Sequence, residues 1–325
     1  MRPATLGLVA GCALAACVLP GRAEGPAFVD DAGRSVSVTV TPKRVMPAGP
    51  PADMLLFALA PDLMVGLVTP WNDAQRAVLA EPERDLAIVP RLTPEPLNSD
   101  LAAVRALKVD LVVDYGDVAP KYVAVADRVS ATTGVPAVLL DGRLAATPAA
   151  LRRLGALLER RAVAEDLARL AEATLTRLEP LATLPDDARV PVYLARGADG
   201  LDAVAAGTTL DEAIRFAGGR NVVARTGSPF RDLTPEAVAA LAPRVVIVED
   251  ARAVAPDAPL RRALPATTAI LVDEHDGFHW VENPPSVNRL IGAVWLAGRL
   301  HPGTEGLDDA AARDLARRFL RLRGS

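Results

Sequence analysis

One stretch in the middle of the chain constrains the fold more than any other feature, because residues 147–183 carry a long helical pattern without turn signals. The stretch holds a single glycine, Gly155, and no proline between Pro148 and Pro180. Its leucines recur at spacings close to the helical period. Thr147 followed by Pro148 is typical of a helix start. The pattern predicts a stiff helical connection.

Apolar runs typical of buried parallel strands lie on both sides of this stretch and alternate with helical segments. Such alternation favours an α/β fold with mainly parallel sheets. A hairpin is predicted over residues 28–38 and a helix over residues 49–59. The predicted strands are residues 44–48, 64–68, 110–114 and 136–140 before the stretch, and residues 190–195, 244–249 and 269–272 after it.

The predicted fold is therefore two α/β lobes, residues 24–145 and 185–325, with a bridging helical segment over residues 146–184. One helix, roughly residues 162–183, carries the connection. A single stiff helix between two lobes predicts a clamp whose lobes move little and that binds a ligand in the cleft between them.

The first 23 residues predict export from the cytoplasm. Arg2 precedes an apolar run over residues 6–19, and the small residues Gly21 and Ala23 fit a cleavage site before Glu24. In a second interpretation, the sequence Leu-Ala-Ala-Cys that ends at Cys17 resembles a bacterial lipobox, and Cys17 becomes a lipidated N-terminus. Both interpretations predict a periplasmic protein.

Composition excludes several classes of function. The only cysteines, Cys12 and Cys17, lie in the exported leader, so the mature chain has no disulfide, no thiolate metal site and no cysteine nucleophile. A net charge of −4 argues against a nucleic-acid partner. No P-loop, dinucleotide-binding, zinc-protease or nucleophile-elbow motif occurs in the sequence. We therefore expect a binding protein without a cofactor rather than an enzyme.

Four motifs in order resemble those of the substrate-binding proteins of ABC importers for ferric siderophores, haem and vitamin B12. The motifs are residues 29–34 (VDDAGR), 106–113 (ALKVDLVV), 217–222 (AGGRNV) and 283–292 (NPPSVNRLIG). The resemblance covers the whole mature chain. It implies the class III architecture of these proteins, with two Rossmann-like lobes bridged by one long helix, and a monomer that delivers its ligand to an ABC permease in the inner membrane.

Members of this family usually dock on the permease through a glutamate on the outer surface of each lobe. Glu236 matches that position in the second lobe. In the first lobe the aligned residue is Ala102, and the nearest acidic residue is Asp100. The resemblance thus assigns docking to Glu236 and Asp100, with a departure from the family pattern in the first lobe.

Three candidate ligand-binding residues come just after predicted strands, Trp71 after two intervening residues. Trp71, Tyr115 and Arg196 come after residues 64–68, 110–114 and 190–195, respectively. The carboxyl ends of strands in an open parallel sheet face the ligand crevice, so these side chains are expected there. The competing interpretation is that Arg196 is a solvated arginine in a turn and that the aromatic residues belong to the core.

Four further candidates lie in and before the predicted helix that follows Pro284 and Pro285. The free N–H groups of a helix start bind anions, and arginine pairs with carboxylate or oxyanion oxygens. The alternatives are that Ser286 is a structural cap, Arg289 a surface residue and Trp280 a core residue. Neither Arg196 nor the arginine of this group is expected to be in the core. The four candidates are Trp280, Ser286, Asn288 and Arg289.

His275 and His279, with nearby acidic residues, suggest a metal site, but a solvated loop is the favoured interpretation, and we predict no metal. The leading hypothesis for function is the binding of a ferric siderophore-like iron chelate. Molybdate or tungstate, cobalamin and haem are the alternative ligands. An alternative of another class is a chelatase-like enzyme on the same fold, for which His279 is the only evident titratable candidate.

Overall fold

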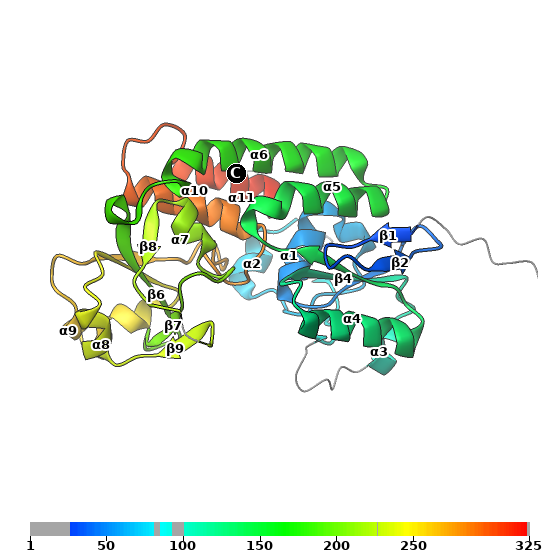
Figure 1. The fold of residues 1–325 in the computed structure, drawn as a ribbon, viewed down its shortest axis with the longest axis horizontal. Coiled ribbons are helices and arrows are strands. Elements are labelled where there is room, and N and C mark those ends of the chain that lie inside the picture. The colour runs from blue at the N-terminus through cyan, green and yellow to red at the C-terminus, as the bar shows by residue number, and fades with distance from the viewer. Residues whose placement is uncertain (1–26, 81–84, 93–100, 226, 324–325) are drawn as a thin grey trace, which may run out of the picture.

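The computed structural model describes residues 27–80, 85–92, 101–225 and 227–323. The chain forms two α/β lobes, and the helix α6 (Arg161–Ala182) runs along one side of the molecule across both of them (Figure 1). This confirms the predicted fold class. The predicted leader with Cys17, and the docking candidate Asp100, lie outside the described residues.

The N-terminal lobe is built on a parallel sheet with the strand order β3-β4-β5, which contains three of the four strands predicted for this half of the chain. The antiparallel hairpin of β1 and β2 precedes it. Residues 64–68 form isolated bridges, Val45 with Met64 and Leu67 with Ile88, rather than the predicted strand. The strands are β1 (Ala27–Val29), β2 (Ser35–Ser37), β3 (Val45–Pro47), β4 (Leu111–Gly116) and β5 (Ala137–Asp141). The helices are α1 (Pro50–Leu59), α2 (Asp73–Val78), α3 (Leu101–Ala106) and α4 (Pro120–Thr133).

The C-terminal lobe has a mixed sheet with the order β11-β10-β6-β7-β9, in which β8 also pairs with β6. Its parallel part, β6, β8, β10 and β11, includes all three predicted strands, whereas β7 and β9 are antiparallel and were not predicted. The strands are β6 (Val190–Arg196), β7 (Asp202–Val204), β8 (Gly219–Asn221), β9 (Phe230–Asp232), β10 (Val245–Val248) and β11 (Ala269–Val272). The helices are α7 (Glu212–Phe216), α8 (Pro235–Ala240) and α9 (Pro259–Ala263).

The stretch of helical pattern divides into two helices, α5 (Thr147–Leu157) and α6, which pack side by side. The turn between them has Glu159 in the left-handed conformation, with φ of 56°. The backbone N–H of Arg160 donates to the carbonyl of Gly155 over 2.7 Å, which closes the end of α5. Glycine is the usual residue at such a position, and a glutamate there gives no sequence signal for the break.

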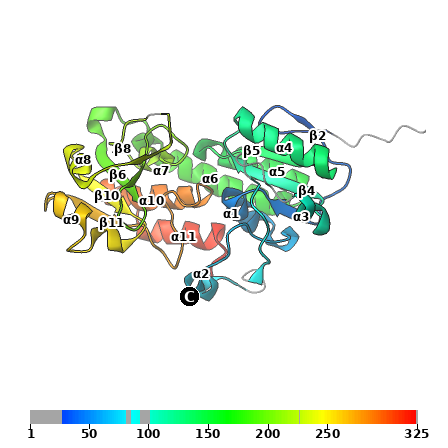
Figure 2. The ribbon, with the colours of Figure 1, turned by 90° about the horizontal axis from the view of Figure 1, so that it is seen from below.

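Two C-terminal helices, α10 (Asn288–Leu300) and α11 (Asp309–Phe319), pack on one another and complete a helical layer with α6. The largest apolar core continues through this layer from one lobe to the other. The chain then returns to the N-terminal lobe, where Leu322 pairs with Leu79 beside α2 (Figure 2). None of the described helices is long and apolar enough to cross a membrane. Representative core residues are Leu55, Leu167, Leu178, Leu194 and Leu290.

Candidate functional site: the cleft between the lobes

A cleft of about 660 Å³ lies between the two lobes. The N-terminal lobe contributes the carboxyl ends of β4 and β5 and the starts of α1 and α4, and the C-terminal lobe contributes the end of β6 and several loops. This is the placement expected for the ligand crevice of an α/β sheet. Of the predicted ligand residues, Tyr115 and Arg196 line this cleft, as does the α1 start at residues 49–51.

Two glycines allow the ends of β4 and β5 to meet at the cleft wall. The backbone N–H of Gly142 donates to the carbonyl of Gly116 over 2.8 Å. A Cβ atom at residue 142 would lie 2.5 Å from the Gly116 Cα, so a side chain does not fit there. Glycine at 142 therefore allows the ends of β4 and β5 to approach closely at the cleft wall.

Four cationic side chains, taken over the described residues, line the cleft from both sides. Arg91 and Lys121 come from the N-terminal lobe, and Arg196 and Arg225 from the C-terminal lobe. Arg225 donates to the carbonyl of Gly207 over 2.8 Å. An anion between the lobes would thus meet positive charge on both walls.

Arg196 is held in place by three different contacts. Its guanidinium carbon lies 4.3 Å from the centre of the Phe230 ring. Its Nε lies 3.2 Å from a carboxyl oxygen of Glu282, and its Nη1 lies 3.5 Å from a carboxyl oxygen of Asp202. A freely solvated turn arginine would have none of these contacts, so Arg196 is a fixed part of the cleft wall.

The cleft also has aromatic and apolar surface. Tyr115 is 1% exposed, and its hydroxyl lies 3.1 Å from the hydroxyl of Thr147. Burial raises the pKa of Tyr115, so the phenol stays neutral. Tyr122 lies under the ammonium of Lys121 at 5.0 Å. Prolines, which have no N–H to donate, add a rigid apolar surface. They are Pro50, Pro51, Pro229, Pro284 and Pro285.

Two acidic residues of the cleft hold their protons more tightly than usual. Burial raises the pKa of Asp114 to about 6, although the nearby Arg91 acts in the opposite direction. Burial, followed by the charge of Glu249, raises the pKa of Glu282 to about 8. Near neutral pH Asp114 is mostly ionised and Glu282 mostly protonated, so Glu282 makes the cleft more positive than a count of its charged residues indicates.

Arg289 has a different place from the one expected. It is 0% exposed, so the expectation that it lies outside the core is wrong. Its guanidinium lies 2.9 Å from a carboxyl oxygen of Glu212 and also donates to the carbonyls of Gly142 and Thr209. Gly142 and Thr209 line opposite walls of the cleft, whereas Arg289 lies beneath them. Arg289 thus braces the cleft from below.

The other candidates near the start of α10 are also buried. Ser286 does not cap α10, because its hydroxyl donates to the carbonyl of Pro51 in the other lobe over 2.6 Å. The Asn288 amide donates to the carbonyl of His279 over 2.9 Å. Trp280 is 4% exposed and stacks on the His275 ring at 3.6 Å. None of these side chains is part of the cleft lining.

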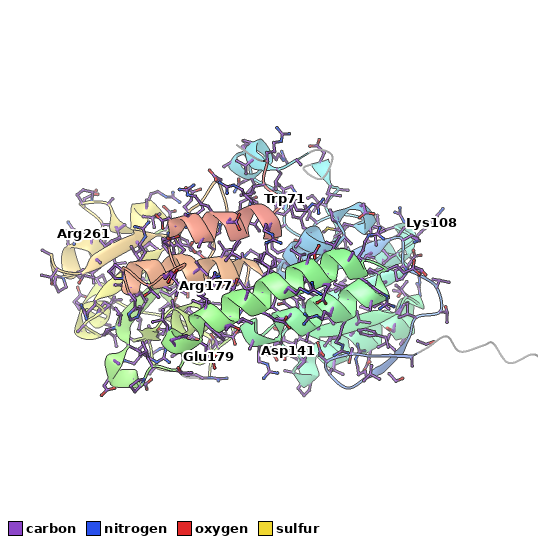
Figure 3. All side chains as sticks on the ribbon, turned by 90° about the horizontal axis from the view of Figure 1, so that it is seen from above. Trp71, Lys108, Asp141, Arg177, Glu179 and Arg261 are labelled. Carbon is purple, nitrogen blue, oxygen red and sulfur yellow. The ribbon has the colours of Figure 1, made fainter. Side chains whose placement is uncertain are left out.

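Trp71 lies in the core beside α2, on the far side of α5 and α6 from Asp141, which ends β5 (Figure 3). Its ring packs edge-on against Phe57 at 5.1 Å and lies 6.0 Å from Phe278. Because residues 64–68 do not join the sheet as a strand, Trp71 does not follow a strand end, and it does not line the cleft.

A smaller pocket of about 450 Å³ opens next to the cleft, and His279 lines it together with Glu249 and Glu274. The Nδ1 atom of His279 faces the carbonyl of Asp273. Within the described residues, no group of three or more histidine, cysteine or acidic side chains is arranged to hold a metal ion.

Sequence reasoning missed Arg91, Lys121 and Arg225. Arg91 and Arg225 lie in irregular segments, and Lys121 is in the first turn of α4. Helical or strand periodicity gives no signal for arginines in such loops. The position of Lys121 directly after β4 was the one available hint, because a helix that follows a strand in an α/β unit starts at the cleft.

Comparison with solved structures shows which known proteins share this fold. A solute-binding protein of an ABC transporter from Sulfurospirillum deleyianum has a TM-score of 0.81 and 20% sequence identity, covering 92% of this chain and 97% of that one. The molybdate periplasmic binding protein of Haemophilus influenzae has a TM-score of 0.70 and 19% identity, with coverage of 92% and 99%. The periplasmic vitamin B12-binding protein of Vibrio cholerae has a TM-score of 0.61 and 17% identity, with coverage of 80% and 97%. No family model and no curated protein sequence matches the chain.

The chain has the fold of the periplasmic solute-binding proteins of ABC transporters, with two sheet-containing lobes and a long helix between them. Proteins of this fold carry ligands as different as molybdate and vitamin B12. The fold therefore leaves the ligand to be argued from the side chains of the cleft.

Proposed function

We propose that this protein is the solute-binding component of an ABC importer, located in the periplasm, and that it captures an anionic iron chelate between its lobes. The observation that carries the proposal is the lining of the cleft, where cationic side chains from both lobes surround aromatic rings and prolines. A ferric siderophore-like chelate combines a negative charge with extended organic surface, so it complements both properties.

The size of the cleft also favours an organic chelate over a bare oxyanion. A volume of about 660 Å³ is far larger than a tetrahedral oxyanion requires. Such an oxyanion is bound best by converging N–H donors, whereas Pro50, Pro51, Pro284 and Pro285 offer none. A cleft of this size also suits haem and cobalamin, which are organic ligands too. A binding experiment must therefore distinguish these two ligands from a siderophore.

Delivery of the ligand requires docking on a permease, and Glu236 is our candidate in the C-terminal lobe. It is exposed in the first turn of α8, which Thr234 caps by accepting from the backbone N–H of Ala237 over 3.2 Å. A capped helix start presents the carboxylate in a fixed position. We also propose that Asp100 docks on the permease in the N-terminal lobe and that the protein is a monomer. Export takes place with either cleavage of the leader or lipidation at Cys17.

The first experiment identifies the ligand directly. Protein purified from its own periplasm is analysed by native mass spectrometry with metal analysis, and the ligand-free protein is titrated calorimetrically with catecholate and hydroxamate ferric siderophores, haemin, cobalamin and molybdate. We expect iron in the native protein and binding of a ferric siderophore. Binding of molybdate, haemin or cobalamin alone would replace the iron chelate by that ligand.

The second experiment tests the charged wall of the cleft. Replacing Arg196 or Arg225 by alanine should each weaken binding of the ferric chelate by about 1.5–3 kcal/mol, because a hydrogen bond to a charged group is lost. This corresponds to roughly 10- to 150-fold in Kd. Arg196→Lys should restore little, since lysine lacks the planar fork of arginine.

The matched control is Arg261→Ala, which removes an arginine at the far end of the C-terminal lobe (Figure 3). Its affinity should equal that of the wild type. If the Arg196 and Arg225 variants bind the chelate as tightly as the Arg261 variant, the cationic wall does not hold the ligand and the proposed site is wrong.

A further inference from the structure

Two glutamates meet behind Arg196, between the cleft and the smaller pocket, and of these Glu282 is buried and Glu249 partly buried. Glu282 lines the cleft and is 3% exposed, and Glu249 lines the smaller pocket. Their carboxyl groups are within hydrogen-bonding reach of each other. Over the described residues, the Arg196 Nε and one carboxyl oxygen of each glutamate are buried without a hydrogen-bond partner.

The contact between the two glutamates, with a buried and unpartnered oxygen on each, favours a proton shared between them. Two ionised carboxylates only accept hydrogen bonds, so they cannot bond to each other, and their charges repel in a poorly solvated site. With one proton, the same pair forms a hydrogen bond and carries a single negative charge. The cation of Arg196, 3.2 Å from Glu282, then faces one charge rather than two.

We infer that Glu282, which shares a proton with Glu249, is a positioning residue that holds Arg196 in the cleft wall and releases its guanidinium to an anionic ligand while the pair is protonated. The inference rests on the proposed function, because it needs an anion in the cleft. When the pair has lost its proton, Glu282 competes with the anion for Arg196.

Charged groups from several elements lie near the pair, and Asp250, Arg252 and Glu274 line the smaller pocket with Glu249. Arg196 approaches from β6, Asp273 lies just after β11, and His279 lies in the loop that leads to Glu282. Asp273 is committed elsewhere, since it accepts from the backbone N–H groups of Trp280 and Val281 over 2.9 and 2.8 Å. Asp273 adds a further negative charge that favours keeping the proton.

Ionisation of Glu282 should make anion binding depend on pH. The pKa of Glu282 is raised to about 8, so Glu282 is neutral below that pH and ionised above it. Binding of an anion should therefore weaken as the pH rises above about 8, and the loss approaches about tenfold per pH unit, the limit for one linked proton. Below about 8 the affinity should change little for an anion of constant charge.

The first arm of the test uses the protein without ligand. NMR of glutamate side-chain carboxyl carbons, with resonances assigned through Glu282→Gln and Glu249→Gln, follows the protonation of the pair. We expect one proton to remain on the pair up to about pH 8, and Arg196→Gln to retain it to higher pH because a stabilising cation is gone. Titration of both carboxyls near their ordinary value of about 4.3 would overturn the inference.

The second arm measures the Kd of a hexadentate ferric tris-catecholate siderophore, in which one molecule supplies all three catechols and the charge stays constant, from about pH 7 to about pH 9.5. The wild type should lose affinity above about pH 8, and Glu282→Gln, which cannot ionise, should not. At about pH 9 the variant should bind about tenfold more tightly than the wild type. Equal pH slopes for the two proteins would overturn the inference.

Glu249→Gln gives an independent check if Glu282→Gln does not fold. It removes the like charge that raises the pKa of Glu282, so the loss of affinity should begin at a lower pH. If the loss of affinity in Glu249→Gln begins at the same pH as in the wild type, Glu282 and Glu249 do not share a proton.

Two controls alter groups outside the pair. Asp202→Asn removes the other carboxylate near Arg196, and His279→Gln removes the neighbouring histidine, and both should keep the wild-type slope above about pH 8. Loss of the slope in the His279 variant would overturn the assignment to Glu282. If the wild type binds no iron chelate at any pH, the proposed function is wrong, and so is the release of the Arg196 guanidinium to such a ligand. The NMR measurement does not depend on a ligand, so it alone decides whether the pair of glutamates holds a proton.

Discussion

The guanidinium of Arg289 lies where three parts of the chain meet beneath the cleft. It contacts Gly142 at the end of β5, Thr209 and Glu212 at the start of α7, and the carbonyl of Ser286 before its own helix. Replacing it by methionine should cost about 3–5 kcal/mol of unfolding free energy, because the Glu212 carboxylate would stay buried without its partner. Denaturant unfolding measures the loss.

The control is Arg299→Ala in the same helix. Arg299 pairs with Asp309 at 2.8 Å, but both side chains are about half exposed, so the cost should stay below about 1 kcal/mol. If the Arg289 variant is as stable as the Arg299 variant, the buried pair does not brace the cleft.

At the scale of elements, the packing of α5 against α6 depends on one glycine. A Cβ atom at Gly155 would lie 2.1 Å from the Cβ of Ala164. Because neither atom can move by changing a rotamer, Gly155→Ala should force the helices apart and cost about 1–3 kcal/mol. This exceeds the gain of about 1 kcal/mol that alanine normally brings to a helix. Thermal unfolding tests the sign.

A second substitution separates the clash from other effects. Ala164→Gly removes the atom that the new methyl meets, so the double variant should recover stability relative to Gly155→Ala. Gly227→Ala serves as the neutral control, since a Cβ there meets nothing within 4 Å. A Gly155→Ala protein more stable than the wild type would show that the two helices tolerate the methyl without separating.

At the scale of the whole molecule, several contacts at the base of the cleft oppose hinge motion. Besides α6, the lobes are joined by the hydrogen bond from Ser286 to Pro51 and by the one from the Leu144 N–H to Glu212 over 2.8 Å. The apolar core is also continuous from lobe to lobe. Closing the lobes by a large rotation would break these contacts at once.

We therefore expect only a small movement of the lobes on binding. Solution scattering of the protein with and without a ferric siderophore should give nearly the same radius of gyration, and crystal structures of both states should superpose as whole molecules. A large rotation about α6 would contradict the prediction and would mean that the hydrogen bonds beneath the cleft are remade on closure.

The sequence by itself determined the elements that depend on local pattern. Apolar runs such as residues 110–114 and 244–249 identify buried strands because both faces of a central strand are covered. Since strand carboxyl ends meet at the cleft, the same pattern predicted that Tyr115 and Arg196 lie at the cleft wall, and both do, although the side chain of Tyr115 is buried in the core. The division of the helical stretch at Glu159 carried no such signal, because the residue in the left-handed turn is not a glycine.

Only the tertiary structure decided which side chains face the cleft and which lie beneath it. Arg196 and Arg289 are alike in sequence terms, yet one ends a strand at the cleft wall and the other is buried under it. The difference depends on how α10 packs against α6 and α7, which brings Glu212 to Arg289 from a distant part of the chain. The meeting of Glu249 with Glu282 has the same origin. Such pairings follow from long-range packing, and the local periodicity of a sequence does not contain them.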